Sequence, residues 1–217
     1  MFPLPKHMYF EIGAFFISLL CYQKIRNKPL QWFIPFLFFI VLVELSGNYI
    51  TKVLGIPNPR LFNFTIPVEH FFYTYIFYKN FKTPLFRKFA GSLLVFIPLF
   101  ALFNMTFIQG FTNLNTNILL VGSCIMIALC CLYFVDLFKR DEEILLVREP
   151  LFWITTGLLV FNLGELSYNL FLDYILKNRH DAGAVLFLSI ISVLIYVLYT
   201  FISIGLLCLK THHSRKM

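Results

Sequence analysis

Three glutamates stand inside segments that are otherwise almost entirely apolar: Glu44, Glu69 and Glu165. An acidic residue at the centre of a membrane-spanning helix costs roughly 2.5–3.5 kcal/mol, so such residues are rare. Where they occur, they usually bind an ion, a proton or a substrate. Carboxyl groups that lie close together in a low dielectric cannot all ionise, so we expect these side chains to share a proton.

Polar side chains recur at helical spacing around two of these glutamates. The first stripe contains Glu44, Asn48 and Thr51, and the second contains Asn162, Glu165, Asn169 and Asp173. Residues three, four and seven positions apart lie on one face of a helix. We therefore expect the two stripes to face a common axis and to form a polar vestibule that opens to one side of the protein.

The third glutamate has polar neighbours of another kind. Tyr73 lies four residues after Glu69 and shares its helix face, whereas His70 points about 100° away. The candidate ligand-binding residues are thus Glu44, Asn48, Glu69, His70, Tyr73, Asn162, Glu165 and Asn169. Because no Lys or Arg falls in the membrane core of these segments, we expect a cation, a proton or a small polar molecule as the ligand, and an anion is disfavoured.

The segments that carry these residues are too apolar for a water-soluble fold. Of the 217 residues, 59% are apolar and 13% are charged, whereas soluble domains have about 45–50% and about 25%. A membrane-spanning helix needs about 20 apolar residues. The hydropathy predicts an all-α polytopic membrane protein that forms a single transmembrane domain over residues 1–217. We expect seven transmembrane helices, at 8–24, 30–51, 64–81, 87–108, 114–138, 150–174 and 183–209.

Basic residues are divided unevenly between the alternate loops of this arrangement. One side carries Lys24, Arg26, Lys28, Lys79, Lys82, Arg87, Lys88, Lys139, Arg140, Arg148, Lys210, Arg215 and Lys216. The other side carries Lys6, Lys52, Arg60, Lys177 and Arg179. The positive-inside rule places the richer side in the cytoplasm. We expect a multi-pass protein of the plasma or inner membrane, with its N-terminus outside and its C-terminus cytoplasmic. The net charge of +7 then reflects topology, and the partner is the lipid bilayer rather than a nucleic acid.

An internal repeat with an offset of 121 residues organises the chain. Residues 29–48 and 150–169 are identical at nine of twenty positions, among them the two tryptophans of the protein, Trp32 and Trp153. The same offset aligns Glu44 with Glu165. It also aligns Tyr75 and Tyr78 with Tyr196 and Tyr199. The pattern predicts two parallel three-helix repeats, 8–81 and 114–209, joined by a linker helix at 87–108.

The repeat is broken at one polar position. Glu69 and His70 align with Ile190 and Ile191. A titratable pair that occurs in only one copy would suit a single asymmetric ligand.

This three-plus-one-plus-three arrangement resembles the PQ-loop and SWEET transporters of the transporter–opsin–receptor superfamily, which share the predicted orientation. The resemblance implies transport of a small solute by two three-helix units. The chain departs from those families because it contains no Pro-Gln dipeptide. It is also similar to uncharacterised bacterial seven-helix membrane proteins with one Glu late in the second helix and another early in the third, a similarity that implies no activity.

Three functions are compatible with these features. The leading hypothesis is a transporter of a small polar molecule, a cation or a proton. A membrane receptor or sensor that signals to a cytoplasmic protein partner is the first alternative. The second is an intramembrane lipid-modifying enzyme that uses Glu69 and His70 as acid and base. No hydrolase motif appears, and too few histidines lie in the apolar segments for a zinc site. We therefore expect no metal and no cofactor, and catalysis is the weakest of the three.

A structural explanation also has to be weighed for the polar stripes. Carboxyl and amide side chains hydrogen-bond between membrane helices with a gain of about 0.6–2 kcal/mol each. For the asparagines alone, such interhelical bonds explain the pattern as well as a ligand does. Two symmetric Glu-Asn pairs together with Glu69 favour a ligand.

Three smaller sequence features concern a signal peptide, glycosylation and an ion pair. Glu11 lies inside the first apolar segment and argues against a cleavable signal peptide, whose central region is uniformly apolar. Asn63 and Asn104 begin Asn-x-Thr glycosylation sequences, which chance explains. Asp136 is expected to form an ion pair with Lys139 and Arg140 on one face of a helix.

Overall fold

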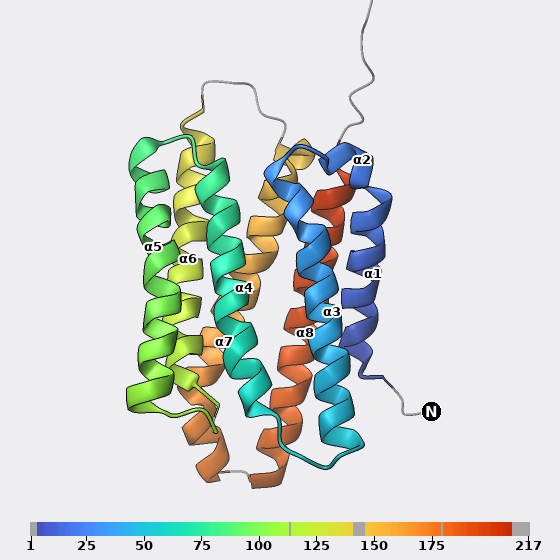
Figure 1. Ribbon diagram of the computed structural model, residues 1–217, viewed down its shortest axis with the longest axis vertical. Helices are drawn as coiled ribbons and strands as arrows, with labels where there is room; N and C mark the ends of the chain where they lie inside the picture. The colour runs from blue at the N-terminus through green and yellow to red at the C-terminus, as the bar shows by residue number, and fades with distance from the viewer. Residues whose placement is uncertain (1–3, 113, 141–145, 179, 210–217) are drawn as a thin grey trace, which may run out of the picture.

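The computed structural model of the chain describes residues 4–112, 114–140, 146–178 and 180–209, with the side chains of residues 171–188 outside the described part. Within those residues every regular element is helical. The α-helices are α1 (Lys6–Leu20), α2 (Tyr22–Ile25), α3 (Phe33–Lys52), α4 (Pro59–Asn80), α5 (Pro84–Phe103), α6 (Thr116–Phe138), α7 (Pro150–Asn178) and α8 (His180–Leu207) (Figure 1). A 3-10 turn, Pro29–Trp32, leads into α3, and a π-helical turn, Asn104–Ile108, follows α5.

Proline and glycine set several of the helix boundaries. Pro59, Pro84 and Pro150 are the first residues of α4, α5 and α7. Proline suits this position because its missing N–H has no partner there and its φ is already helical. Gly55 and Gly110 have positive φ values of 65° and 75° in the turns after α3 and after the π-helical turn. These turns reverse the chain direction and make successive long helices antiparallel.

Six of the helices form a ring. α1 packs against α3 and α8, α8 packs against α7, α7 against α6, and α6 against α4. α3 contacts α4 and closes the ring, while α5 lies outside it against α4 and α6 (Figure 1). We call the end of the bundle where α2 lies the α2 end, and the end where α1 begins the opposite end.

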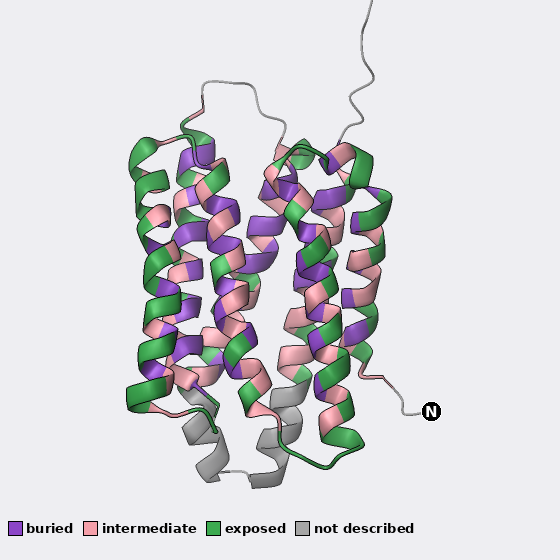
Figure 2. Cartoon of the chain, in the orientation of Figure 1, coloured by how far each residue is buried: buried purple, intermediate pink, exposed green. Residues whose placement is uncertain are grey.

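The apolar core fills the half of the bundle nearer the α2 end. Its fully buried side chains include Phe33, Phe77, Tyr133, Ile154, Ile202 and Leu206. Aromatic rings join α3 to α4, where Phe36 and Phe72 stack with their centroids 3.8 Å apart. Figure 2 shows α7 and α8 changing from mostly buried near the α2 end to intermediate exposure further along. The α2 half is therefore the close-packed part of the molecule.

Glycine lets α7 and α8 approach closely in this half. A Cβ at Gly157 would lie 2.6 Å from the Cβ of Phe201, and one at Gly205 would lie 2.6 Å from the carbonyl oxygen of Pro150. Any larger residue would push the two helices apart. Small residues at such contacts are typical of helices that associate in lipid, where close van der Waals packing contributes much of the stability.

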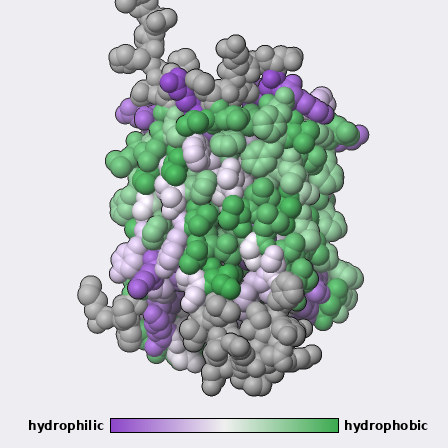
Figure 3. Space-filling view, turned by 180° about the vertical axis from the view of Figure 1, so that it is seen from behind, coloured by the Kyte–Doolittle hydropathy of each residue, from purple (hydrophilic) through white to green (hydrophobic). Residues whose placement is uncertain are grey.

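The outer surface of the bundle is apolar between its two ends. Among the described residues, four helical segments are long and apolar enough to cross a membrane: Pro29–Lys52, Pro84–Ile108, Thr116–Phe138 and Ser189–Leu207. Figure 3 shows hydrophobic residues dominating the band between the ends, with hydrophilic residues gathered toward them. The predicted segments 8–24, 64–81 and 150–174 overlap α1, α4 and α7, which are not among the four. α1 has only 15 residues.

The described basic side chains follow the division predicted from the loops. The α2 end carries Lys24, Arg26, Lys28, Lys79, Lys82, Arg87, Lys88, Lys139, Arg140 and Arg148, and the opposite end carries Lys6, Lys52 and Arg60. The side chains of Lys177, Arg179, Lys210, Arg215 and Lys216 lie outside the described residues.

Candidate functional site

Four glutamates from four helices of the ring form one electrostatically connected group. Glu11 comes from α1, Glu44 from α3, Glu69 from α4 and Glu165 from α7. Glu69 interacts electrostatically with Glu44 and Glu165, and Glu11 interacts with Glu44 and Glu69. We call these four residues the glutamate cluster. It contains all three glutamates that the sequence predicted and one that it did not.

Glu11 is the member of the cluster that sequence reasoning missed. Its side chain is 3% exposed, and its buried Oε2 atom has no hydrogen-bond partner. The signal was present in the sequence, because Glu11 is an acidic residue within an apolar helix like the other three. The same residue also argues against a signal peptide, and that interpretation does not require a functional role.

The side chain of Glu44 is the accessible edge of the cluster. It is 25% exposed, and its Oε2 atom lies 3.8 Å from Nε2 of His7, whose side chain is 22% exposed. His7 lies in the first turn of α1, one helical turn before Glu11. Asn48, one turn after Glu44 on α3, is half-buried.

Glu165 is tied to a different helix. Its Oε2 accepts a hydrogen bond of 2.8 Å from the Ser123 hydroxyl of α6. The neighbouring amides bond within their own helix: Asn162 Nδ2 donates to Leu158 O at 2.7 Å, and Asn169 Nδ2 donates to Glu165 O at 2.9 Å. Asp173, at the end of the predicted stripe, lies outside the described side chains. The bond between helices in this region is therefore made by the carboxyl rather than by these amides.

Two tyrosines border the cluster. Tyr73 of α4 interacts electrostatically with Glu69 and Glu11. Tyr199 of α8 interacts with Glu11, Tyr73, Glu69 and Glu44. Each is 5% exposed and belongs to the apolar core. The phenol groups thus mark the boundary between the glutamate cluster and the α2 half.

The structure does not bring His70 to the glutamate cluster. Its imidazole packs on Gly122 of α6, where an added Cβ would overlap the ring. Its Nδ1 lies 2.8 Å from Ile66 O on its own helix. Residues of α5, such as Phe96 and Ile97, line the same small space. Glu69 and His70 therefore face different helices, an arrangement that gives them no common substrate position.

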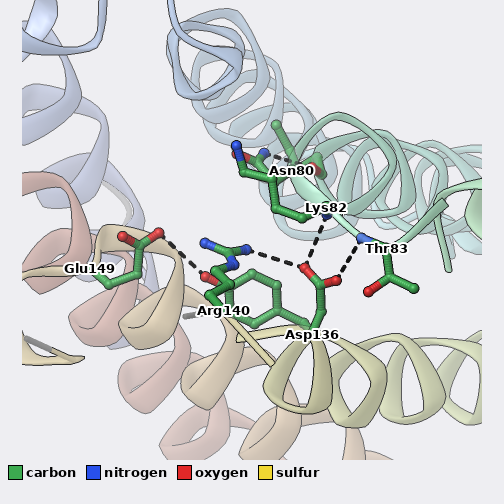
Figure 4. Close-up of polar contacts among 8 residues, drawn as sticks. Asn80, Lys82, Thr83, Asp136, Arg140 and Glu149 are labelled. Atoms are coloured by element: carbon green, nitrogen blue, oxygen red, sulfur yellow. Dashed lines mark hydrogen bonds and ion pairs between the residues drawn. The ribbon is translucent and has the colours of Figure 1, made fainter. Parts of the chain in front are cut away.

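A separate set of polar side chains at the α2 end has a structural role (Figure 4). Asp136, 1% exposed, accepts hydrogen bonds from the backbone N–H groups of Lys82 at 3.1 Å and Thr83 at 2.8 Å. The predicted ion pair with Arg140 is confirmed at 3.3 Å. Lys139 instead places its Nζ 5.3 Å from the ring centre of Phe86. Asp136 thus holds the start of α5 against α6, with donors from two sides.

Buried amides hold the chain at the opposite end of α5. Asn104 Nδ2 donates to Gln109 Oε1 at 2.9 Å, and Asn117 Nδ2 donates to Asn104 Oδ1 at 3.0 Å. Asn63 Oδ1 accepts from Asn115 N at 2.9 Å. Asn63 and Asn104 are 2% and 0% exposed. In the folded protein these two amides are therefore inaccessible to glycosylation.

The chemistry available to the glutamate cluster is that of carboxyl, hydroxyl and phenol groups. Among the described residues, no three His, Cys, Asp or Glu side chains are arranged to hold a metal ion. No protein-family model matches the chain, and no curated protein or solved structure matches it.

Proposed function

We propose that this chain is an integral membrane protein that transports a cation, a proton or a small polar molecule through the glutamate cluster. The observation that carries the proposal is the electrostatic link of Glu69 with Glu44 and Glu165, on three different helices. Acidic groups within apolar helices are costly and mark ion, proton or substrate pathways. Their convergence in one half of the bundle fits a ligand pathway better than separate structural bonds.

The proposed topology has seven spans, with the N-terminus outside and the C-terminus in the cytoplasm. It is supported by the four long apolar helices and by the excess of basic residues at the α2 end, which becomes the cytoplasmic end. α1, α4 and α7 form the ring together with α3, α6 and α8. A helix that carries a carboxyl can cross lipid at lower cost when that group faces a bundle interior.

The order of the helices in the ring supports the proposed repeat. A half-turn of the ring brings α1, α3 and α4 onto α6, α7 and α8. Each helix contact in one unit then has a counterpart. The α1–α3 contact corresponds to α6–α7, the α3–α4 contact to α7–α8, and the α4–α6 contact to α8–α1. Two parallel units of this kind, with α5 as the linker, fit the proposed resemblance to PQ-loop and SWEET transporters.

Transport in this arrangement requires the two units to move against each other. The glutamate cluster lies on the outer side of the packed α2 half, whose rings include Phe33, Phe36 and Phe77. A solute that enters from outside meets the carboxyls and is stopped by this core. Rocking of the two three-helix units would open the α2 half and close the outer half around the same site.

The proposal is tested with purified protein in liposomes that contain a pH-sensitive dye, with imposed proton and Na⁺ gradients as the two probes. We expect a flux that Glu44→Gln and Glu165→Gln each abolish. Glu149→Gln is the matched control, because Glu149 contacts Tyr133 at the α2 end, away from the cluster. Flux that survives both cluster substitutions would show that the cluster is not the pathway.

A receptor is the second candidate and is favoured by the basic α2 end. Arg87 and Lys79 both lie over the ring of Tyr78, at 5.1 and 5.7 Å from its centre, and give this end a fixed positive patch. A receptor would show ligand-dependent stabilisation in the absence of flux. It would also yield a cytoplasmic partner that cross-links to the α2 end.

A further inference from the structure

Glu11 and its neighbours form a series of titratable groups that runs inward from an exposed edge. His7 and Glu44, each about one-quarter exposed, lie 3.8 Å apart between Nε2 and Oε2. Glu44 interacts electrostatically with Glu11, which is 3% exposed. His7 and Glu11 are also four residues apart on α1, and residues at this spacing lie on one helix face.

Among the described residues, the groups that interact electrostatically with Glu11 would not stabilise its negative charge. Its electrostatic partners Glu44 and Glu69 are acidic, and Tyr199 of α8 is a phenol. Its Oε2 atom is buried and accepts no hydrogen bond. An ionised carboxylate in such surroundings is costly, whereas a protonated carboxyl has no net charge and gains an O–H donor.

A proton is also the occupant that requires the least space. It binds to a lone pair of the Glu11 carboxylate, whose electrostatic neighbours are the carboxylates of Glu44 and Glu69. Release reverses the step, because the proton passes to Glu44 and then to the imidazole of His7 or to water. Tyr73 and Tyr199 border the series on the other side, next to the apolar core.

We propose that Glu11 is the central proton-binding carboxyl of this protein and that it exchanges its proton with the outside through Glu44 and His7. This inference rests on the proposed function for the identity of the site and for which end is outside. It narrows the ligand class to the proton and assigns residues to two tasks. Glu11 binds the proton, and His7 with Glu44 forms its access path.

The direct test is infrared difference spectroscopy of the full chain in lipid nanodiscs, which follows the C=O stretch of protonated carboxyl groups as the pH is raised. We expect one carboxyl band to persist at neutral pH, to disappear in Glu11→Gln, and to remain in Glu165→Gln. Should Glu11→Gln fail to fold, Glu11→Asp keeps the carboxyl and should shift the band. A neutral-pH band that Glu11→Gln leaves intact, or that all cluster variants weaken equally, would overturn the assignment.

The access path is tested by the rate at which the band responds to a rapid change of external pH. His7→Gln should slow this response several-fold and leave the final band unchanged. Tyr9→Phe is the matched control, because Tyr9 lies in the same turn of α1 and is exposed. An unchanged rate in His7→Gln would remove His7 from the path.

These measurements do not require flux, so the two proposals can fail separately. A Glu11 band without flux in liposomes would leave a proton-binding protein that does not transport. Flux that Glu44→Gln abolishes, with no band assigned to Glu11, would leave the transporter and exclude Glu11 as its proton site.

Discussion

Buried carboxyl groups have different hydrogen-bonding environments in the two halves of the bundle. In the α2 half, Asp136 is 1% exposed and accepts hydrogen bonds from two backbone N–H groups and from Arg140. In the other half, Glu11 is 3% exposed, and its Oε2 has no donor. Both side chains are almost inaccessible to solvent, and the difference lies in the groups that face them.

This contrast separates a structural role from a binding role. A buried carboxylate with several donors is satisfied by the fold itself and strengthens the contact it makes. A buried carboxyl without donors lowers stability, and such groups are retained where a function requires them. By this criterion Asp136 belongs to the structure of the α2 end, and Glu11 belongs to the glutamate cluster.

The largest effect is expected at Asp136. Asp136→Ala removes the acceptor for three donors and leaves Arg140 without its ion-pair partner, so the free energy of unfolding should fall by about 3–5 kcal/mol. Thermal unfolding of the purified protein in detergent measures this loss. Lys139→Ala is the control and should have little effect, because Lys139 contacts the Phe86 ring instead. Equal stability of the two variants would contradict the structural role of Asp136.

Substitution of Glu11 is expected to change the free energy of unfolding in the opposite direction. Glu11→Leu replaces a carboxyl whose buried Oε2 lacks a donor with an apolar side chain of similar size, and should raise the free energy of unfolding by about 1–4 kcal/mol. The same unfolding measurement applies, with Glu11→Gln as a polar control of nearly unchanged shape. If Glu11→Leu destabilises as strongly as Asp136→Ala, the contrast between the two halves is wrong.

His70 provides a third buried side chain to compare with Asp136 and Glu11, because it lies outside the glutamate cluster. Gly122→Ala should destabilise the protein by about 1–3 kcal/mol, because its Cβ overlaps the His70 ring and overpacking has this cost. Adding His70→Ala should restore most of the loss. Gly13→Ala is the control, because no atom lies within 4 Å of its Cβ position. Losses that simply add in the double variant would exclude the packing contact.

The helices could be predicted from the sequence because their boundaries depend on local signals. Six of the predicted segments each overlap one long helix, whereas 8–24 overlaps both α1 and α2. The overlap arises because apolar runs and the prolines at 59, 84 and 150 act over a few residues. Glu44, Glu69 and Glu165 were found because an acidic residue in an apolar run stands out whatever its partners are. Glu11 is also an acidic residue in an apolar run. Its position in the first apolar segment drew attention to the question of a signal peptide instead of a binding site.

The remaining features depend on contacts between distant segments. Ser123 reaches Glu165 across 42 positions, and Thr83 reaches Asp136 across 53, and neither pairing has a local signal. His70 became a candidate because Glu69 and His70 stand where the repeat is broken, and the repeat does not indicate which helix the imidazole packs against. The bonds of Asn162 and Asn169 to the carbonyls four residues earlier follow a local pattern that Asn side chains are known to adopt.

The measurement that tests the central claim most directly is proton flux through Glu69→Gln in liposomes. Glu69 is the member of the cluster linked to both symmetry-related glutamates, Glu44 and Glu165. We expect this variant to fold, to show the size and helix content of the unchanged protein, and to have lost its flux. Flux at the unchanged rate would contradict a shared site, and the glutamates would then be separate structural groups.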